Sequence, residues 1–165
     1  VLIEAGYDVS VAQNGTNALS YVQRSSPPDL ILLDVMMPGM SGFEVCEKLK
    51  SSSSTSGIPI IFLTAKTETE DIVKGFELGG VDYISKPFQP KEILVRIKTH
   101  IDLVTVKRQL EVKNRLFNKL KEWQEETDDP LRFPDKLKDL TTELDTIITS
   151  AKRQNWSYPE YLYGQ

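Results

Sequence analysis

Short apolar runs alternate with amphipathic stretches over the first hundred residues of the chain. The runs at 30–33 and 58–63 are almost continuously apolar, which is typical of strands buried on both faces of a sheet. Residues 7–12 alternate between apolar and polar side chains and predict a further strand. Residues 81–85 predict a short one.

Between and after these predicted strands, apolar residues recur at helical spacing. The spacing predicts a short helix capped by Asn14 or Thr16, and longer helices over 42–50, over 67–78 and from Pro90 onward. The expected buried face of the 42–50 helix carries Phe43, Val45, Cys46 and Leu49. Regular alternation of strands and helices predicts an α/β fold, a parallel sheet with helices on both faces.

Three polar residues stand where predicted strands end: Asp34, Thr64 and Lys86. The carboxyl ends of parallel strands meet at one edge of a sheet, and ligands bind there. A carboxylate can attack phosphorus, an ammonium suits phosphate oxygens, and a hydroxyl can donate to them. Each residue also has a structural interpretation: Asp34 can cap the turn that follows it, Thr64 can cap the following helix, and Lys86 can be a solvated surface charge.

Composition narrows the classes of function. A chain of 165 residues allows one ordinary domain and an extension, and its net charge of -4 argues against nucleic-acid binding through a basic face. The single cysteine, Cys46, excludes an internal disulfide and a multi-cysteine metal site. No apolar run is long enough to span a bilayer, so we expect no membrane association and a cytoplasmic location. The only histidine, His100, is expected at the surface of a helix.

The segment 29–42, Asp-Leu-Ile-Leu-Leu-Asp-Val-Met-Met-Pro-Gly-Met-Ser-Gly, resembles the phosphoacceptor segment of bacterial response-regulator receiver domains. Thr64-Ala65 and Lys86-Pro87-Phe88 match the family's later motifs in the same order. The resemblance covers residues 1 to about 104. It implies a flavodoxin-like doubly wound parallel sheet.

The resemblance also implies roles for individual residues. Asp34 would take a phosphoryl group from a histidine kinase or a phosphotransfer protein, and Thr64 and Lys86 would contact that group. Tyr83 falls where the family carries its aromatic switch residue, and the Lys86–Pro87 peptide bond is expected to be cis. Such a module is not an enzyme in the usual sense.

The family's first strand, which ends in an acidic pair that holds Mg²⁺, has no counterpart in this sequence. Asp34 and the backbone carbonyl of Met36 remain as expected metal ligands, and the missing pair counts against Mg²⁺ binding by this chain. The two neighbouring strands could close up, another chain could supply a strand, or the natural protein could have more sequence upstream. We expect the last, because Val1 is not an initiator residue and residues 1–5 resemble the last turn of a helix, with Gly6 as its C-cap.

Beyond the receiver-like part, 105–129 is predicted to be a connector helix or a short coiled coil, and 130–165 a helical segment with an aromatic tail. Apolar residues spaced by three and four, interrupted by Lys113, carry the first prediction: Leu103, Val106, Leu110, Phe117 and Leu120. An amphipathic helix folded back on its own domain is the alternative.

Two functions from different classes remain open. The first is a phosphoacceptor module of a two-component phosphorelay that signals through its C-terminal helix. The second is a non-phosphorylated pseudo-receiver that serves in docking or dimerisation, with a homodimer among its partners. The missing acidic pair supports the second.

Overall fold

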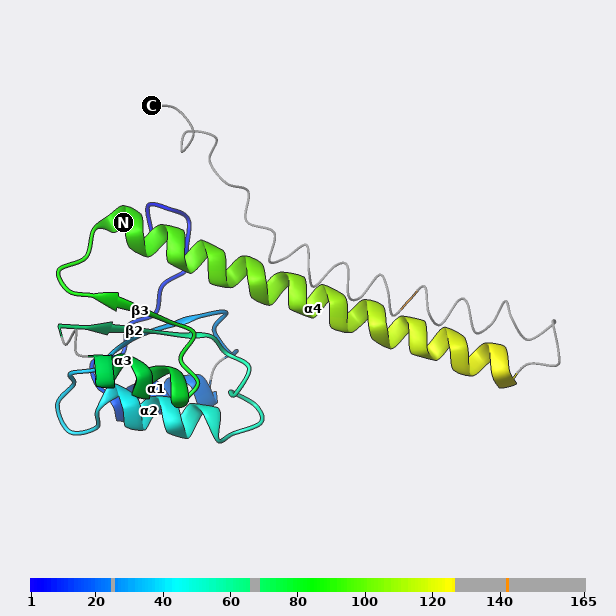
Figure 1. The fold of residues 1–165 in the computed structure, drawn as a ribbon, viewed down its shortest axis with the longest axis horizontal. Coiled ribbons are helices and arrows are strands. Elements are labelled where there is room, and N and C mark those ends of the chain that lie inside the picture. Colours follow the sequence, from blue (N-terminus) through cyan, green and yellow to red (C-terminus); the bar gives the residue numbers. More distant parts are fainter. Residues whose placement is uncertain (25, 66–68, 127–141, 143–165) are drawn as a thin grey trace, which may run out of the picture. The chain divides into compact units, whose positions relative to one another are not determined.

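The computed structural model describes residues 1–24, 26–65, 69–126 and 142, although the side chains of 123–126 are not described. Its elements, in chain order, are α1 Gly15–Arg24, β1 Ile31–Asp34, α2 Gly42–Lys50, β2 Ile60–Thr64, α3 Thr69–Glu77, β3 Asp82–Ser85 and α4 Pro90–Glu126 (Figure 1). The chain divides into two compact units, 1–104 and 105–165.

The described strands form one parallel sheet in the order β1-β2-β3. Asp34 pairs with Leu63 of β2, and Thr64 pairs with Ser85 of β3. The ends of the three strands therefore lie next to one another at one edge of the sheet. This parallel arrangement confirms the predicted α/β fold.

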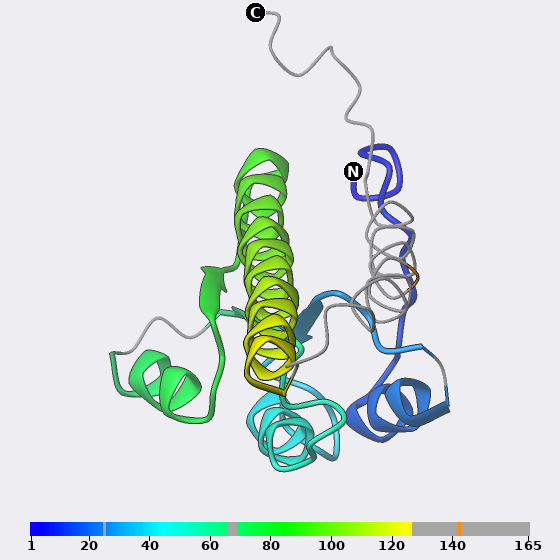
Figure 2. The ribbon, with the colours of Figure 1, turned by 90° about the vertical axis from the view of Figure 1, so that its right-hand side faces the viewer.

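Helices cover both faces of the sheet (Figures 1 and 2). One core lies between the sheet and α1, α2 and α3; its buried members are Val22, Leu33, Val35, Phe43, Val45, Cys46, Leu49, Ile58, Ile60 and Phe62. The second core joins Ile61 and Ile84 to Ile93 and Ile97 of α4. The strands carry buried apolar residues on both sides, as their continuous apolar runs predicted.

Helix α2 begins and ends where its sequence predicted. The Ser41 hydroxyl accepts a hydrogen bond from the Glu44 N–H, and the Glu44 carboxylate accepts one from the Ser41 N–H, which forms a capping box. All four apolar residues expected on its buried face are buried there. Burial raises the pKa of the Cys46 thiol, against a smaller opposing effect of Lys50, as befits a core residue.

The predicted strand over 7–12 is wrong, because these residues are neither helix nor strand in the structure. Alternation of apolar and polar side chains makes a strand only when a neighbouring strand accepts its backbone hydrogen bonds. No strand in the described ranges lies beside it. Residues 2–6 form turns, and Gly6 has a φ of 85° there, as expected of a C-capping glycine.

Helix α4 begins at Pro90, as predicted, and continues to Glu126. Ile93 and Ile97 are buried and Ile101 is partly buried against the second core. The predictions for 130–165 lie outside the described residues, apart from Thr142. Within the residues that the structure describes, no helix is both long and apolar enough to cross a membrane.

Candidate functional site

Asp34 is the last residue of β1, and the loop that follows holds its side chain. The Met36 N–H donates to Asp34 Oδ1 over 3.0 Å. The side chain of Asp34 keeps 33% of its surface exposed. This carboxylate is therefore both oriented and accessible, which a nucleophile requires.

The backbone behind Asp34 is held closely by Gly42 at the start of α2. The Gly42 N–H donates to the Val35 carbonyl over 3.1 Å. A Cβ at position 42 would lie 2.2 Å from the Asp34 carbonyl oxygen. Only glycine permits this close approach, so Gly42 fixes the position of the loop that carries Asp34.

Lys86 follows β3, and its ammonium donates to Asp34 Oδ2. The two residues come from strands separated by β2, so the parallel topology alone brings them together. Lys86 retains 37% side-chain exposure, which leaves the pair open to a ligand. The Lys86–Pro87 peptide bond is cis, as the family resemblance implied.

Thr64 ends β2 between these two residues and is fully buried. Its carbonyl oxygen accepts a hydrogen bond of 2.7 Å from the Lys86 N–H. The structure thus places Thr64 directly beside Lys86 at the same sheet edge. All three residues predicted at strand ends are found at this edge.

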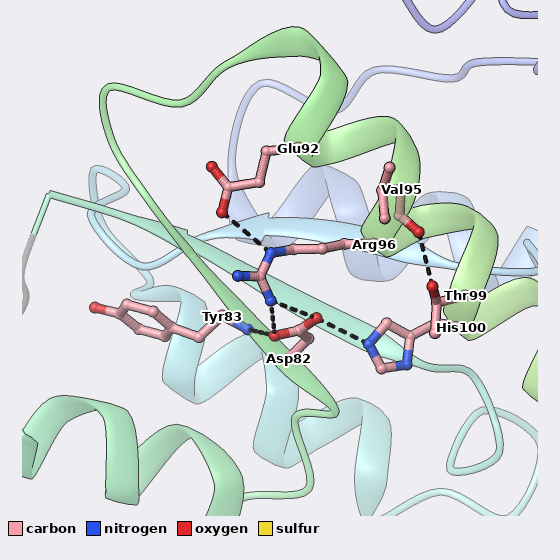
Figure 3. A network of polar contacts seen from close by, with 7 residues as sticks. All are labelled: Asp82, Tyr83, Glu92, Val95, Arg96, Thr99 and His100. Atoms are coloured by element: carbon pink, nitrogen blue, oxygen red, sulfur yellow. Dashed lines mark hydrogen bonds and ion pairs between the residues drawn. The ribbon is translucent and has the colours of Figure 1, made fainter. Parts of the chain in front are cut away.

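Tyr83 is the second residue of β3 and is half-buried, with its side chain packed against the first core. In Figure 3 its ring points away from the polar groups that surround Asp82. Successive strand residues face opposite sides of a sheet, so β3 carries a core-packed aromatic and a carboxylate on its two faces.

The residues present fit only part of a magnesium site. Asp34 can supply a carboxylate oxygen and Met36 a backbone carbonyl, and Mg²⁺ completes its octahedron with water or phosphate oxygens. In the part of the chain that the structure describes, no group of three or more His, Cys, Asp or Glu side chains could hold a metal ion.

A polar network that sequence reasoning missed connects β3 to α4 (Figure 3). Arg96 Nη1 donates to both carboxylate oxygens of Asp82, over 2.8 and 3.0 Å, and Arg96 Nε donates to Glu92 over 3.1 Å. His100 Nε2 donates to Asp82 Oδ2 over 3.0 Å. Positions 92, 96 and 100 share one face of a helix, and this spacing could have indicated the network.

The expectation that His100 is a surface residue is therefore wrong. Its side chain is only 15% exposed. The imidazole is drawn inward because Asp82 offers it a carboxylate, and a half-buried polar group needs such a partner. His100 thus belongs to the contact between α4 and β3.

A model of the response regulator receiver domain family matches residues 1–98 of this chain. The DNA-binding response regulator MtrA of Mycobacterium tuberculosis (strain H37Rv) is 50% identical over 101 residues, which are 61% of this chain and 42% of MtrA. The phosphate regulon transcriptional regulatory protein PhoB of Pseudomonas aeruginosa is 47% identical over 94 residues, which are 57% of this chain and 41% of PhoB. The chain thus spans about two fifths of the length of these curated relatives.

Solved structures of response regulators and of a chemotaxis protein are also similar to this chain. A response regulator from Chloroflexus aurantiacus J-10-fl is 36% identical with a TM-score of 0.58, over 61% of this chain and 82% of that one. The chemotaxis protein CheY4 of Vibrio cholerae is 35% identical with a TM-score of 0.56, over 59% of this chain and 81% of that one. The fold is the flavodoxin-like α/β fold, followed by a long C-terminal helix. Since the family model covers more than half of its residues, the chain belongs to the family of response regulator receiver domains.

Proposed function

We propose that this chain is the phosphoacceptor module of a two-component phosphorelay, and that Asp34 takes the phosphoryl group from a histidine kinase or a phosphotransfer protein. One observation carries the proposal: the accessible carboxylate of Asp34, at the end of β1, contacts the ammonium of Lys86, which follows β3. Receiver domains of response regulators are signalling modules rather than classical enzymes.

In the proposed step, a carboxylate oxygen of Asp34 attacks phosphorus and forms an acyl phosphate. The bond between phosphorus and the donor breaks, and the donor leaves with that electron pair. The Met36 N–H supports the proposal because it already orients the carboxylate. Lys86 would neutralise part of the phosphoryl charge, where a positive group has its largest effect on the transition state.

Thr64 and Tyr83 would carry the signal away from the phosphoryl group. The Thr64 carbonyl accepts a hydrogen bond from the Lys86 N–H, so a change at Lys86 reaches the end of β2 directly. Tyr83 lies on β3, and its neighbour Asp82 accepts hydrogen bonds from Arg96 and His100 of α4. We propose that phosphorylation alters this strand and thereby α4, whose part from residue 105 onward falls within the predicted connector over 105–129.

The proposal has a direct chemical test. The whole chain and the variant Asp34→Asn are incubated with acetyl phosphate and Mg²⁺, and the intact masses are measured. One phosphoryl adduct on the parent and none on the variant is the expected result. Circular dichroism of both proteins serves as the folding control, because Asn preserves the size of the side chain.

A folded parent without any adduct would instead favour the second function, a pseudo-receiver that acts in docking. The observation in its favour is the incomplete magnesium site: among the described residues, no acidic cluster accompanies Asp34. Phosphoryl transfer ordinarily relies on a metal ion to neutralise the transferring group, and the receiver family generally binds Mg²⁺ at its phosphorylation site. A cytoplasmic location fits either function and stays a prediction.

A further inference from the structure

Helix α4 carries a stripe of exposed apolar side chains. Its members are Leu103, Val106, Leu110, Phe117 and Leu120, with side chains exposed by 58%, 61%, 55%, 56% and 43%. They recur at intervals of three and four residues, with Lys113 at the one position of this pattern that is not apolar. Below, these residues with Lys113 are called the α4 stripe.

Helical periodicity relates the α4 stripe to the buried residues at the start of the same helix. Each residue turns a helix by about 100°, so residues nine apart lie on opposite sides. Val106 comes nine residues after Ile97, which is buried in the second core. Val95, two residues from Ile97 and on the same side as Val106, is likewise 65% exposed. Along the helix, the α4 stripe is thus on the side opposite Ile97.

The spacing of the α4 stripe is that of a coiled-coil seam. With Leu103, Leu110 and Phe117 at a positions, the d positions are Val106, Lys113 and Leu120. A pattern of three and four residues keeps a seam facing one partner helix over several turns. A charged residue within a seam lowers stability while it restricts register and partner, so Lys113 predicts a weak and reversible association.

The charges beside the seam indicate which partner fits. In a parallel pair, each g position faces the e position five residues further along the other helix. Asp102 at g would then face Lys107 of a second copy, which is a pair of opposite charges. In an antiparallel pair, e positions face e positions, and these carry Lys107 and Lys121 but no acid.

We propose that the α4 stripe is the seam of a parallel homodimer, with α4 of a second copy of this chain as its occupant. Asp102 of each copy pairs with Lys107 of the other, and Lys113 keeps the dimer weak. The dimer forms without phosphorylation, so its test is independent of the role of Asp34.

The test is sedimentation velocity of the whole unphosphorylated chain over a wide range of concentrations. A reversible shift from monomer to dimer is expected, and Leu110→Glu weakens it by about tenfold or more because a charge enters the seam of both copies. Asn118→Glu adds the same charge to an exposed position of α4 outside the seam and leaves dimerisation unchanged. Lys113→Leu strengthens it.

Charge exchange tests the orientation and the identity of the partner. Lys107→Glu sets two acids against each other and weakens the dimer, whereas the double variant Asp102→Lys with Lys107→Glu restores it. If both the parent and Lys113→Leu stay monomeric at every concentration, the proposal is overturned. A dimer that Leu110→Glu leaves intact, or that the double variant does not restore, also overturns it.

Discussion

The ammonium of Lys86 contacts the carboxylate of Asp34, although 52 residues separate them in the chain. Strand β2 lies between the strands that carry them, so the pair exists only because the sheet is parallel and its strand ends are level. This contact gives the candidate site its charge balance. It also makes Lys86 the first residue to test after Asp34.

Lys86→Gln should slow phosphorylation of the chain by acetyl phosphate. The variant removes the positive charge beside Asp34, and loss of one group that stabilises a transition state lowers a rate by on the order of tenfold to a thousandfold. The rate is measured by intact mass as a function of time. Lys91→Gln, at an exposed position of α4, is the matched control and should leave the rate unchanged. Equal rates in both variants would remove Lys86 from the site.

Gly42→Ala should destabilise the fold and disturb the loop that carries Asp34. The new Cβ would lie 2.2 Å from the Asp34 carbonyl oxygen, so backbone atoms must move. We expect a loss of about 2 kcal/mol or more in the free energy of unfolding, as for other overpacked sites. Urea unfolding measures it. Gly57→Ala is the control, since a Cβ there meets no atom within 4 Å.

Thr64→Val should separate phosphorylation from its consequences. Thr64 is fully buried, and valine keeps its shape while the hydroxyl is lost. We expect the variant to accept a phosphoryl group on Asp34 but to lose the resulting change in amide hydrogen exchange across β3 and the start of α4. Ser85→Ala, at the exposed residue paired with Thr64, should respond like the parent. An unaltered exchange response in Thr64→Val would contradict the proposed path.

The stabilising effect of Asp82 should depend on pH. Burial acts to raise the pKa of Asp82, but hydrogen bonds from the Tyr83 N–H, His100 and Arg96, together with the charge of Arg96, outweigh it and hold the pKa below its ordinary value of 3.8. Folding therefore favours the ionised form. The contribution of Asp82 to the free energy of unfolding is present above pH 3.8 and is lost as the pH falls through the lowered pKa.

Urea unfolding of the parent and of Asp82→Asn, repeated from neutral to acidic pH, measures this contribution. At neutral pH the variant should be less stable by about 1–3 kcal/mol, because Arg96 and His100 lose a charged partner. The difference should shrink in acid. Asp8→Asn changes an exposed carboxylate and should stay within about 0.5 kcal/mol of the parent at every pH. A difference for Asp82→Asn that does not vary with pH would contradict the assignment.

Much of the receiver fold follows from local pattern. The bounds of α2 were predictable because Ser41 and Glu44 form a capping box ahead of an amphipathic run. The gathering of Asp34, Thr64 and Lys86 was predictable because each follows an apolar run that parallel pairing brings to one edge.

Residues whose environment depends on distant partners were not predictable in the same way. The alternating segment 7–12 has the pattern of a strand, but a strand also needs a neighbour. The spacing of Arg96 and His100 along α4 indicates a shared helix face, but Asp82, the acid that both contact, lies on β3 and cannot be paired with them from that spacing alone. The resemblance to receiver domains implies a role for Tyr83 but none for its neighbour Asp82.

Locating the phosphoryl group tests directly whether Asp34 is the phosphoacceptor. The whole chain, treated with acetyl phosphate and Mg²⁺, is reduced with borohydride, which converts an aspartyl phosphate to homoserine, and its peptides are sequenced by mass spectrometry. We predict homoserine at position 34 and nowhere else, and none in Asp34→Asn. Homoserine at another aspartate, or none in a folded chain, would contradict this prediction.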